Sequence, residues 1–92
     1  MNAIKTLVGW LEEHFQDGHF TLTPPAGNGY VWFLDIRCNE KYSIVAEWID
    51  ITGFYIYTVS DDLRVEFERV FKTENDTFKY IVELIGKIKC IN

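Results

Sequence analysis

The sequence predicts an α+β fold of two layers, in which an antiparallel sheet carries two helices on one face. Two observations lead to this prediction. Apolar residues near both ends of the 92-residue chain recur at the three- and four-residue spacing of a helix face. The stretch between them is rich in aromatic and β-branched residues, and its gaps are too short for a helix, so neighbouring strands must run antiparallel. The expected order is α-β-β-β-β-(β)-α, a sheet of four or five strands between N- and C-terminal helices, in a single domain over residues 1–92.

The first helix is predicted over residues 3–16, with Asn2 as its cap and Asp17-Gly18 as its end. Its apolar face consists of Ile4, Leu7, Val8, Leu11 and Phe15. The last helix is predicted to begin near Thr73 or Asn75, either of which can cap it. Its apolar face consists of Phe78, Ile81, Leu84, Ile85 and Ile88.

Four segments between the helices are predicted to be strands: an edge strand at His19–Thr23, followed by Tyr30–Arg37, Tyr42–Ile49 and Phe54–Val59. Residues 24–29 hold two prolines and two glycines and are expected to form a loop. The two later connections fit three-residue hairpin loops, Asn39-Glu40-Lys41 and Ile51-Thr52-Gly53, with Gly53 in a left-handed conformation.

Residues 61–71 match two patterns. Leu63, Val65 and Phe67 alternate as in a strand, whereas Leu63, Phe67, Val70 and Phe71 follow a helical spacing. We favour a short fifth strand or an extended connection.

The hairpin loops predict which residues lie opposite one another: Ile36 and Ile44, Leu34 and Ala46, Trp32 and Trp48, and Trp48 and Ile56. Side chains alternate along a strand, so these residues share one face, which both helices are needed to cover. The opposite face then receives Val31, Phe33, Asp35, Arg37, Ser43, Val45, Glu47, Ile49, Tyr55 and Tyr57. Large apolar groups and phenols on an uncovered face are typical of a protein-binding surface.

The chain is acidic, with a formal net charge of −5. Residues 40–68 hold seven carboxylates and two cations, an excess equal to the net charge of the whole chain. Nucleic acid is not expected as a direct partner, because phosphate binding needs clustered Lys and Arg, and no two of these are adjacent here.

A membrane span is not expected, because the longest uninterrupted apolar run is Tyr30–Leu34, far shorter than the ~20 residues that a helix needs to cross a bilayer. A secretory signal is not expected either, since Lys5 is the only early cation and Glu12 and Glu13 follow it before a long apolar region can form. We therefore expect a cytoplasmic protein whose Cys38 and Cys90 are reduced thiols, although one disulfide would be possible in an exported chain.

No catalytic residue, cofactor site or metal site is predicted. His14, Asp17 and His19 are close in sequence, but a metal site needs three or four converging ligands and no others are marked. Gly27-Asn28-Gly29 precedes a strand, so no helix N-terminus backs it as a phosphate loop. The serines and cysteines are linked to no base.

The leading hypothesis is a non-catalytic protein-binding module, similar in size and charge to immunity proteins, antitoxins and other acidic inhibitors, that acts on a basic protein partner. Its expected partner-binding residues are Phe33, Asp35, Glu47, Tyr55, Tyr57, Asp61 and Asp62. One alternative is a homo-oligomeric structural or regulatory subunit, in which the uncovered sheet face binds a second copy as a homodimer. A second alternative is a small-ligand-binding domain that uses the aromatic residues as a pocket.

Overall fold

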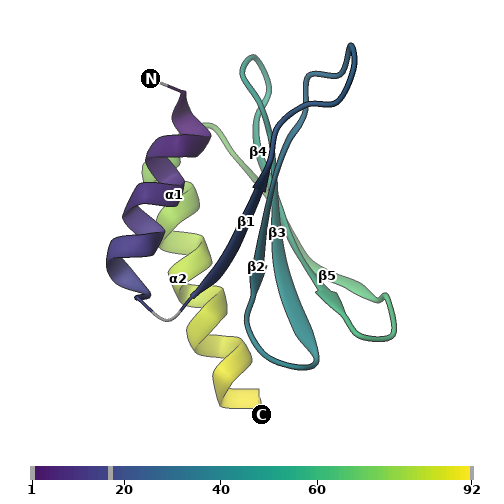
Figure 1. Cartoon of the computed structure of the whole chain (residues 1–92). Coiled ribbons are helices and arrows are strands. Elements are labelled where there is room, and N and C mark those ends of the chain that lie inside the picture. The colour runs from purple at the N-terminus through teal and green to yellow at the C-terminus, as the bar shows by residue number, and fades with distance from the viewer. Residues whose placement is uncertain (1, 17, 92) are drawn as a thin grey trace.

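The computed structural model describes the backbone of residues 2–16 and 18–91, and the side chains of residues 2–16 and 18–88. Its elements follow the predicted order, with all five strands present (Figure 1). They are α1 (Ala3–His14), β1 (His19–Thr23), β2 (Trp32–Arg37), β3 (Tyr42–Ile49), β4 (Gly53–Ser60), β5 (Val65–Phe71) and α2 (Glu74–Ile91). The predicted two-layer α+β fold is therefore confirmed.

Helix α1 begins as predicted and ends early. The side chain of Asn2 accepts a hydrogen bond from the backbone N–H of Lys5 at 3.2 Å, which caps the first turn. At the other end Phe15 leaves helical geometry, while its N–H still donates to the carbonyl of Leu11. The helix thus stops at His14, two residues before the predicted end. The predicted stop at Asp17 lies outside the described residues.

Helix α2 is capped by Thr73, the first of the two predicted candidates. Its hydroxyl oxygen accepts a hydrogen bond from the backbone N–H of Asp76 at 3.2 Å, and Asn75 lies inside the first turn. Thr77 is fully buried, and its hydroxyl donates to the carbonyl of Thr73 at 2.8 Å, so this polar group is satisfied.

The five strands form one antiparallel sheet in sequence order, β1-β2-β3-β4-β5. The β2–β3 pairing agrees with the prediction, with Trp32 opposite Trp48. The predicted pairing of Trp48 with Ile56 is wrong, because Phe54 lies opposite Trp48. The turn closes one residue earlier than expected, since Ile49 already pairs with Gly53. The register moves by two residues, so each side chain keeps its predicted face.

Strand β5 contains a β-bulge, which explains its ambiguous sequence pattern. Its register against β4 shifts between Ile56 and Thr58, and Phe67 has a positive φ of 56°. An extra residue at the bulge interrupts the alternation of side chains along the strand. The apolar residues of this segment therefore follow neither a strand nor a helix pattern throughout.

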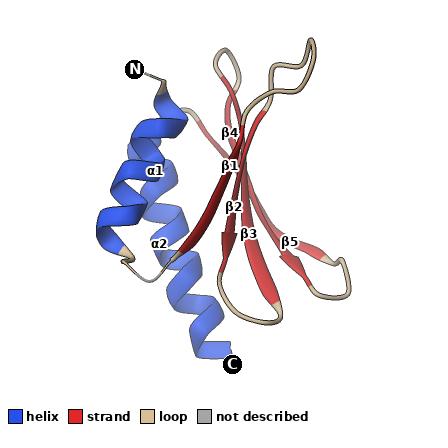
Figure 2. Cartoon of the chain, viewed as in Figure 1, coloured by secondary structure: helices blue, strands red, loops and turns tan. Residues whose placement is uncertain are grey.

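The core lies between the two helices and one face of the sheet, which we call the inner face (Figure 2). It consists of Ile4, Leu7, Leu11, Leu34, Ile36, Ile44, Ala46, Trp48, Phe54, Ile56, Ile81, Leu84, Ile85 and Ile88. The helix residues in this set come from the predicted apolar faces, and the strand residues have the predicted parity. Removal of these side chains from water is the main stabilising contribution to such a core.

Over the part of the chain that the structure describes, neither helix is both long and apolar enough to cross a bilayer. Cys38 is partly buried, and its Sγ donates a weak hydrogen bond to the carbonyl of Ile36 at 3.7 Å. The side chain of Cys90 lies outside the described residues, so the expected redox state of this pair stays a prediction.

Candidate functional site

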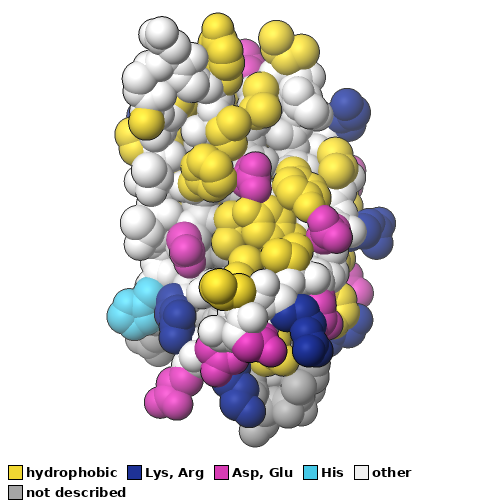
Figure 3. Space-filling model, turned by 90° about the vertical axis from the view of Figure 1, so that its right-hand side faces the viewer, with side chains coloured by type: hydrophobic (Ala, Val, Ile, Leu, Met, Phe, Trp, Pro, Cys, Tyr) yellow, Lys and Arg dark blue, Asp and Glu magenta, His cyan; other side chains and the backbone are white. Residues whose placement is uncertain are grey.

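The sheet face that points away from the helices, which we call the outer face, carries apolar and acidic side chains (Figure 3). Within the strands it consists of His19, Thr21 and Thr23 of β1; Phe33, Asp35 and Arg37 of β2; Ser43, Val45, Glu47 and Ile49 of β3; Tyr55, Tyr57 and Val59 of β4; and Val65, Glu68 and Val70 of β5. Neither helix covers it, as the side view shows (Figure 2). The structure therefore places every strand residue of the predicted opposite face on the uncovered side; Val31 of that prediction precedes β2.

Two tyrosines of β4 form the centre of the outer face. Their rings lie 5.0 Å apart between centroids. The hydroxyl of Tyr57 donates to Oε2 of Glu47 on β3 at 2.6 Å, and the hydroxyl of Tyr55 donates to Glu68 on β5. Each phenol is thus fixed by a carboxylate on a neighbouring strand, which leaves part of its ring available for contact.

The same contacts change the acidity of both phenols. Partial burial raises the pKa of Tyr57, and the hydrogen bond to the Glu47 carboxylate raises it further. For Tyr55, the hydrogen bond to Glu68 is the main cause of a raised pKa. Both side chains therefore stay protonated, and act as hydrogen-bond donors, through the physiological pH range.

A tyrosine pKa that is higher in the folded than in the unfolded chain makes stability depend on pH. The unfolded phenol loses its proton near pH 10, whereas folded Tyr57 keeps it, so the free energy of unfolding is expected to fall as the pH rises above about 10. Tyr57→Phe is expected to reduce this slope, and Tyr55 and Tyr80, whose pKa values are also raised, contribute to it in the same direction.

Urea unfolding at a series of pH values from 8 to 11.5 measures this slope. Tyr30→Phe is the control, because Tyr30 is exposed in the loop between β1 and β2. Equal slopes in the wild type and Tyr57→Phe would contradict the raised pKa of Tyr57, and with it the partial burial of the phenol and its hydrogen bond to Glu47.

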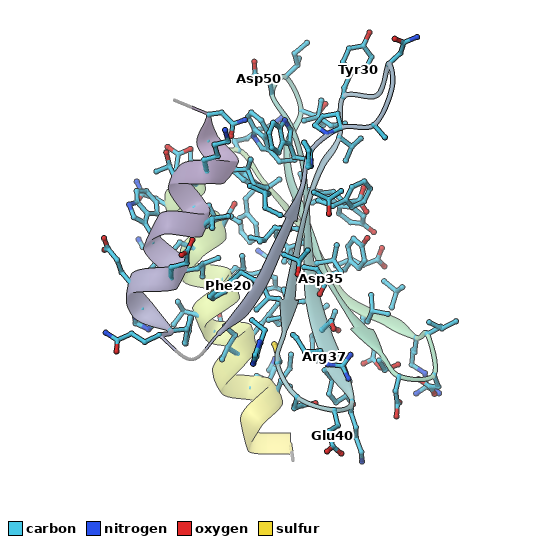
Figure 4. The ribbon with its side chains drawn as sticks, in the orientation of Figure 1. Phe20, Tyr30, Asp35, Arg37, Glu40 and Asp50 are labelled. Atoms are coloured by element: carbon cyan, nitrogen blue, oxygen red, sulfur yellow. The ribbon has the colours of Figure 1, made fainter. Side chains whose placement is uncertain are left out.

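Phe33 and Asp35 of β2 extend the tyrosine centre towards β1. Phe33 lies opposite Glu47 and is 41% exposed, a large value for an aromatic side chain within a strand. Asp35 lies opposite Val45 and points to the open side, whereas Phe20 of β1 lies on the helix side (Figure 4). Five predicted residues, Phe33, Asp35, Glu47, Tyr55 and Tyr57, thus share one continuous surface.

The two remaining predicted residues lie in the β4–β5 loop. Asp61 lines a groove on the outer face together with Asp35 and with two cations, Arg37 and Lys41, so it joins the same surface. Asp62 is bound within its own loop, where the hydroxyl of Ser60 donates to its carboxylate and Arg64 lies 3.9 Å away. The Ser60 hydroxyl, and then the Arg64 charge, lower the pKa of the Asp62 carboxyl. Its charge is partly compensated, so we expect Asp62 to contribute less than Asp61.

Strand β5 adds exposed residues that the sequence analysis did not assign to a site. Val70 lies opposite Tyr55, and Val65 lies opposite Val59. Both valines are exposed, as is Leu63 in the preceding loop. The alternation of Leu63, Val65 and Phe67 was the one available signal, and the bulge at Phe67 obscured which side each residue would take.

Carboxylates predominate among the charged side chains of the outer face. Among the charged strand residues of the outer face, Asp35, Glu47 and Glu68 are carboxylates and Arg37 is a cation. No group of three or more His, Cys, Asp or Glu side chains that could hold a metal ion occurs among the described residues, and Asp17 lies outside them. Comparison of the chain with protein-family models, with curated proteins and with solved structures finds no match.

Proposed function

We propose that the chain is a non-catalytic protein-binding module whose outer face docks on a basic protein. The observation that supports this proposal most directly is the one-sided packing of the sheet. Two helices cover the inner face, and the outer face presents aromatic and branched side chains among carboxylates. Exposed apolar patches of this kind are typical of sites that bind proteins.

The tyrosine centre supports binding on energetic grounds. Tyr55 and Tyr57 are already oriented by hydrogen bonds to Glu68 and Glu47, so a partner would not have to order them. The cost of fixing side chains is a large part of what association must overcome. Tyrosine also combines a large apolar ring with a polar end, which is why it is frequent at interaction surfaces.

The charge of the outer face favours a basic partner over a second copy of the chain. Two copies meeting through this face would bring together two surfaces on which carboxylates (Asp35, Glu47 and Glu68) outnumber the cation Arg37, which is unfavourable. A basic protein would instead be attracted, and its association would be accelerated by the net charge of −5. An acidic surface of this kind could occupy the phosphate-binding groove of a nuclease, so the proposed role is that of an inhibitor or escort.

The experiment that tests the proposal begins with affinity capture by the full chain at low salt. Basic proteins that are retained are then purified and titrated against the chain by calorimetry and by stopped-flow fluorescence. We expect the double variant Tyr55→Ala/Tyr57→Ala to weaken binding at least tenfold, because it removes both central rings. Asp61→Lys/Asp62→Lys is expected to slow association and to reduce its dependence on salt.

The control is Glu83→Lys, which reverses one charge, half the change in the double lysine variant, at an exposed position of α2 on the far side of the molecule. This variant is expected to bind with nearly unchanged affinity. The proposal is wrong if no basic protein is retained, or if a retained protein binds the outer-face variants as tightly as the wild type.

A further inference from the structure

Strand β1 ends the sheet on one side, and its outer edge is open. Among the residues that the structure describes, β1 pairs with β2 alone, as its first position in the strand order shows. In an antiparallel pair, every second residue directs its N–H and C=O away from the partner strand. An edge strand therefore presents unpaired backbone groups to which another extended chain can bind.

A groove runs beside this edge, between β1 and α1. Its apolar lining consists of Val8 from the helix, Phe15 just after the helix end, and Phe20 and Leu22 from the strand. Phe20 and Leu22 lie on the inner face, opposite Ile36 and Leu34 of β2 respectively. They are only partly buried, whereas their two partners on β2 are fully buried. The groove thus continues the core beyond the last strand of the sheet, with a volume of about 440 Å³.

We infer that β1 and this groove bind an extended peptide segment of a partner, which joins the sheet as a sixth strand. Such a segment would lie about 4.8 Å from β1. Every second side chain would point towards the helices, in line with Phe20 and Leu22, and would enter the groove. The backbone edge supplies hydrogen bonds, and the groove selects apolar side chains at alternate positions.

The groove also favours a positively charged residue in the bound peptide. Glu12 is its one charged lining residue among the described side chains, and it is exposed on α1. A Lys or Arg of the segment, placed beside the apolar positions, would meet this carboxylate. The inferred ligand is therefore a short extended peptide with alternating apolar residues and a flanking cation.

The opposite edge of the sheet, β5, has features that discourage pairing with another strand, and β1 lacks them. β5 has a bulge at Phe67 and carries Glu66, Glu68 and Arg69, and bulges and charges both protect edge strands. β1 has no Asp, Glu, Lys or Arg within His19–Thr23. Two prolines follow β1 directly, so its open edge extends over five residues and suits a short segment.

A random heptapeptide library displayed on phage, selected against the full chain, tests the inference. Selected peptides are expected to carry apolar residues at alternate positions with a nearby Lys or Arg. A synthetic copy should lose at least tenfold in affinity when the amides that face β1 are N-methylated, and the same change at the intervening amides should have little effect. Selection of no peptide above background would overturn the inference.

Variants of the chain locate the site and separate it from the outer face. Glu12→Lys is expected to weaken the peptide at least fivefold, while Glu13→Lys, the same change at the next position of α1 outside the groove lining, leaves its affinity unchanged. The variant Tyr55→Ala/Tyr57→Ala should also bind the peptide normally. If the outer-face variant loses the peptide, the inference is wrong.

Discussion

Replacement of Phe54 by alanine is expected to lower the free energy of unfolding by about 3–5 kcal/mol, the usual range for a buried aromatic side chain. Phe54 is 1% exposed and lies opposite Trp48, with the two ring centroids 6.2 Å apart. Truncation removes its apolar surface from the core and leaves a cavity between the sheet and the helix layer. Urea unfolding followed by circular dichroism measures the loss.

The matched control for Phe54 is Phe33→Ala in the same sheet. Phe33 is on the outer face and is 41% exposed, so its removal is expected to cost less than about 1 kcal/mol. The two substitutions therefore compare directly how much a phenylalanine on each face of the sheet contributes to the free energy of unfolding. Similar losses in both variants would mean that the outer face is buried in solution, and the proposed binding surface would then be unavailable.

Gly53→Ala is expected to be the second most destabilising change, with a cost of at least about 1–3 kcal/mol from backbone strain. Gly53 has a φ of +105°, a conformation that residues with a side chain rarely adopt. A Cβ at this position would also lie 2.5 Å from the carbonyl oxygen of Phe71. The backbone of β5 would have to shift, which would weaken its pairing with β4 near Val70. Urea unfolding followed by circular dichroism measures this cost as well.

The control for Gly53 is Gly9→Ala in the middle of α1, where a Cβ would meet nothing within 4 Å. Alanine has the higher helix propensity, so this variant is expected to gain about 0.5–1 kcal/mol. Opposite signs for the two substitutions are the expected result. A stabilising effect of Gly53→Ala would contradict the turn geometry and with it the pairing of Ile49 with Gly53.

Most of the fold could be predicted because short hairpin loops restrict the register of neighbouring strands. The loop between β2 and β3 fixed Trp32 opposite Trp48, as expected. The loop between β3 and β4 closes one residue earlier than its composition indicated. Gly53, which has the positive φ, is not the last loop residue but the first residue of β4, where it pairs with Ile49. The positive φ of Gly53 was therefore predicted correctly, but its position relative to the turn was not.

The candidate site could be predicted only where side-chain alternation is regular. Phe33, Asp35, Glu47, Tyr55 and Tyr57 lie on regular strands, and parity alone places them together. The contribution of β5 could not be predicted, since a bulge changes parity without a distinct sequence signal. The contacts of the tyrosine hydroxyls with Glu47 and Glu68, and the groove beside β1, depend on tertiary distances that no periodicity encodes.

The meander topology has a kinetic consequence. Each strand pairs with the next strand in the sequence, so the sheet can form by successive closure of short loops, which carry a low entropic cost. The contact between α1 and α2 joins residues that are much farther apart in the sequence, because these helices are the first and last elements of the chain (Figure 1). We therefore expect the docking of the two helices to carry a larger entropic cost of chain closure than the pairing of the strands, and to be the slower step of folding.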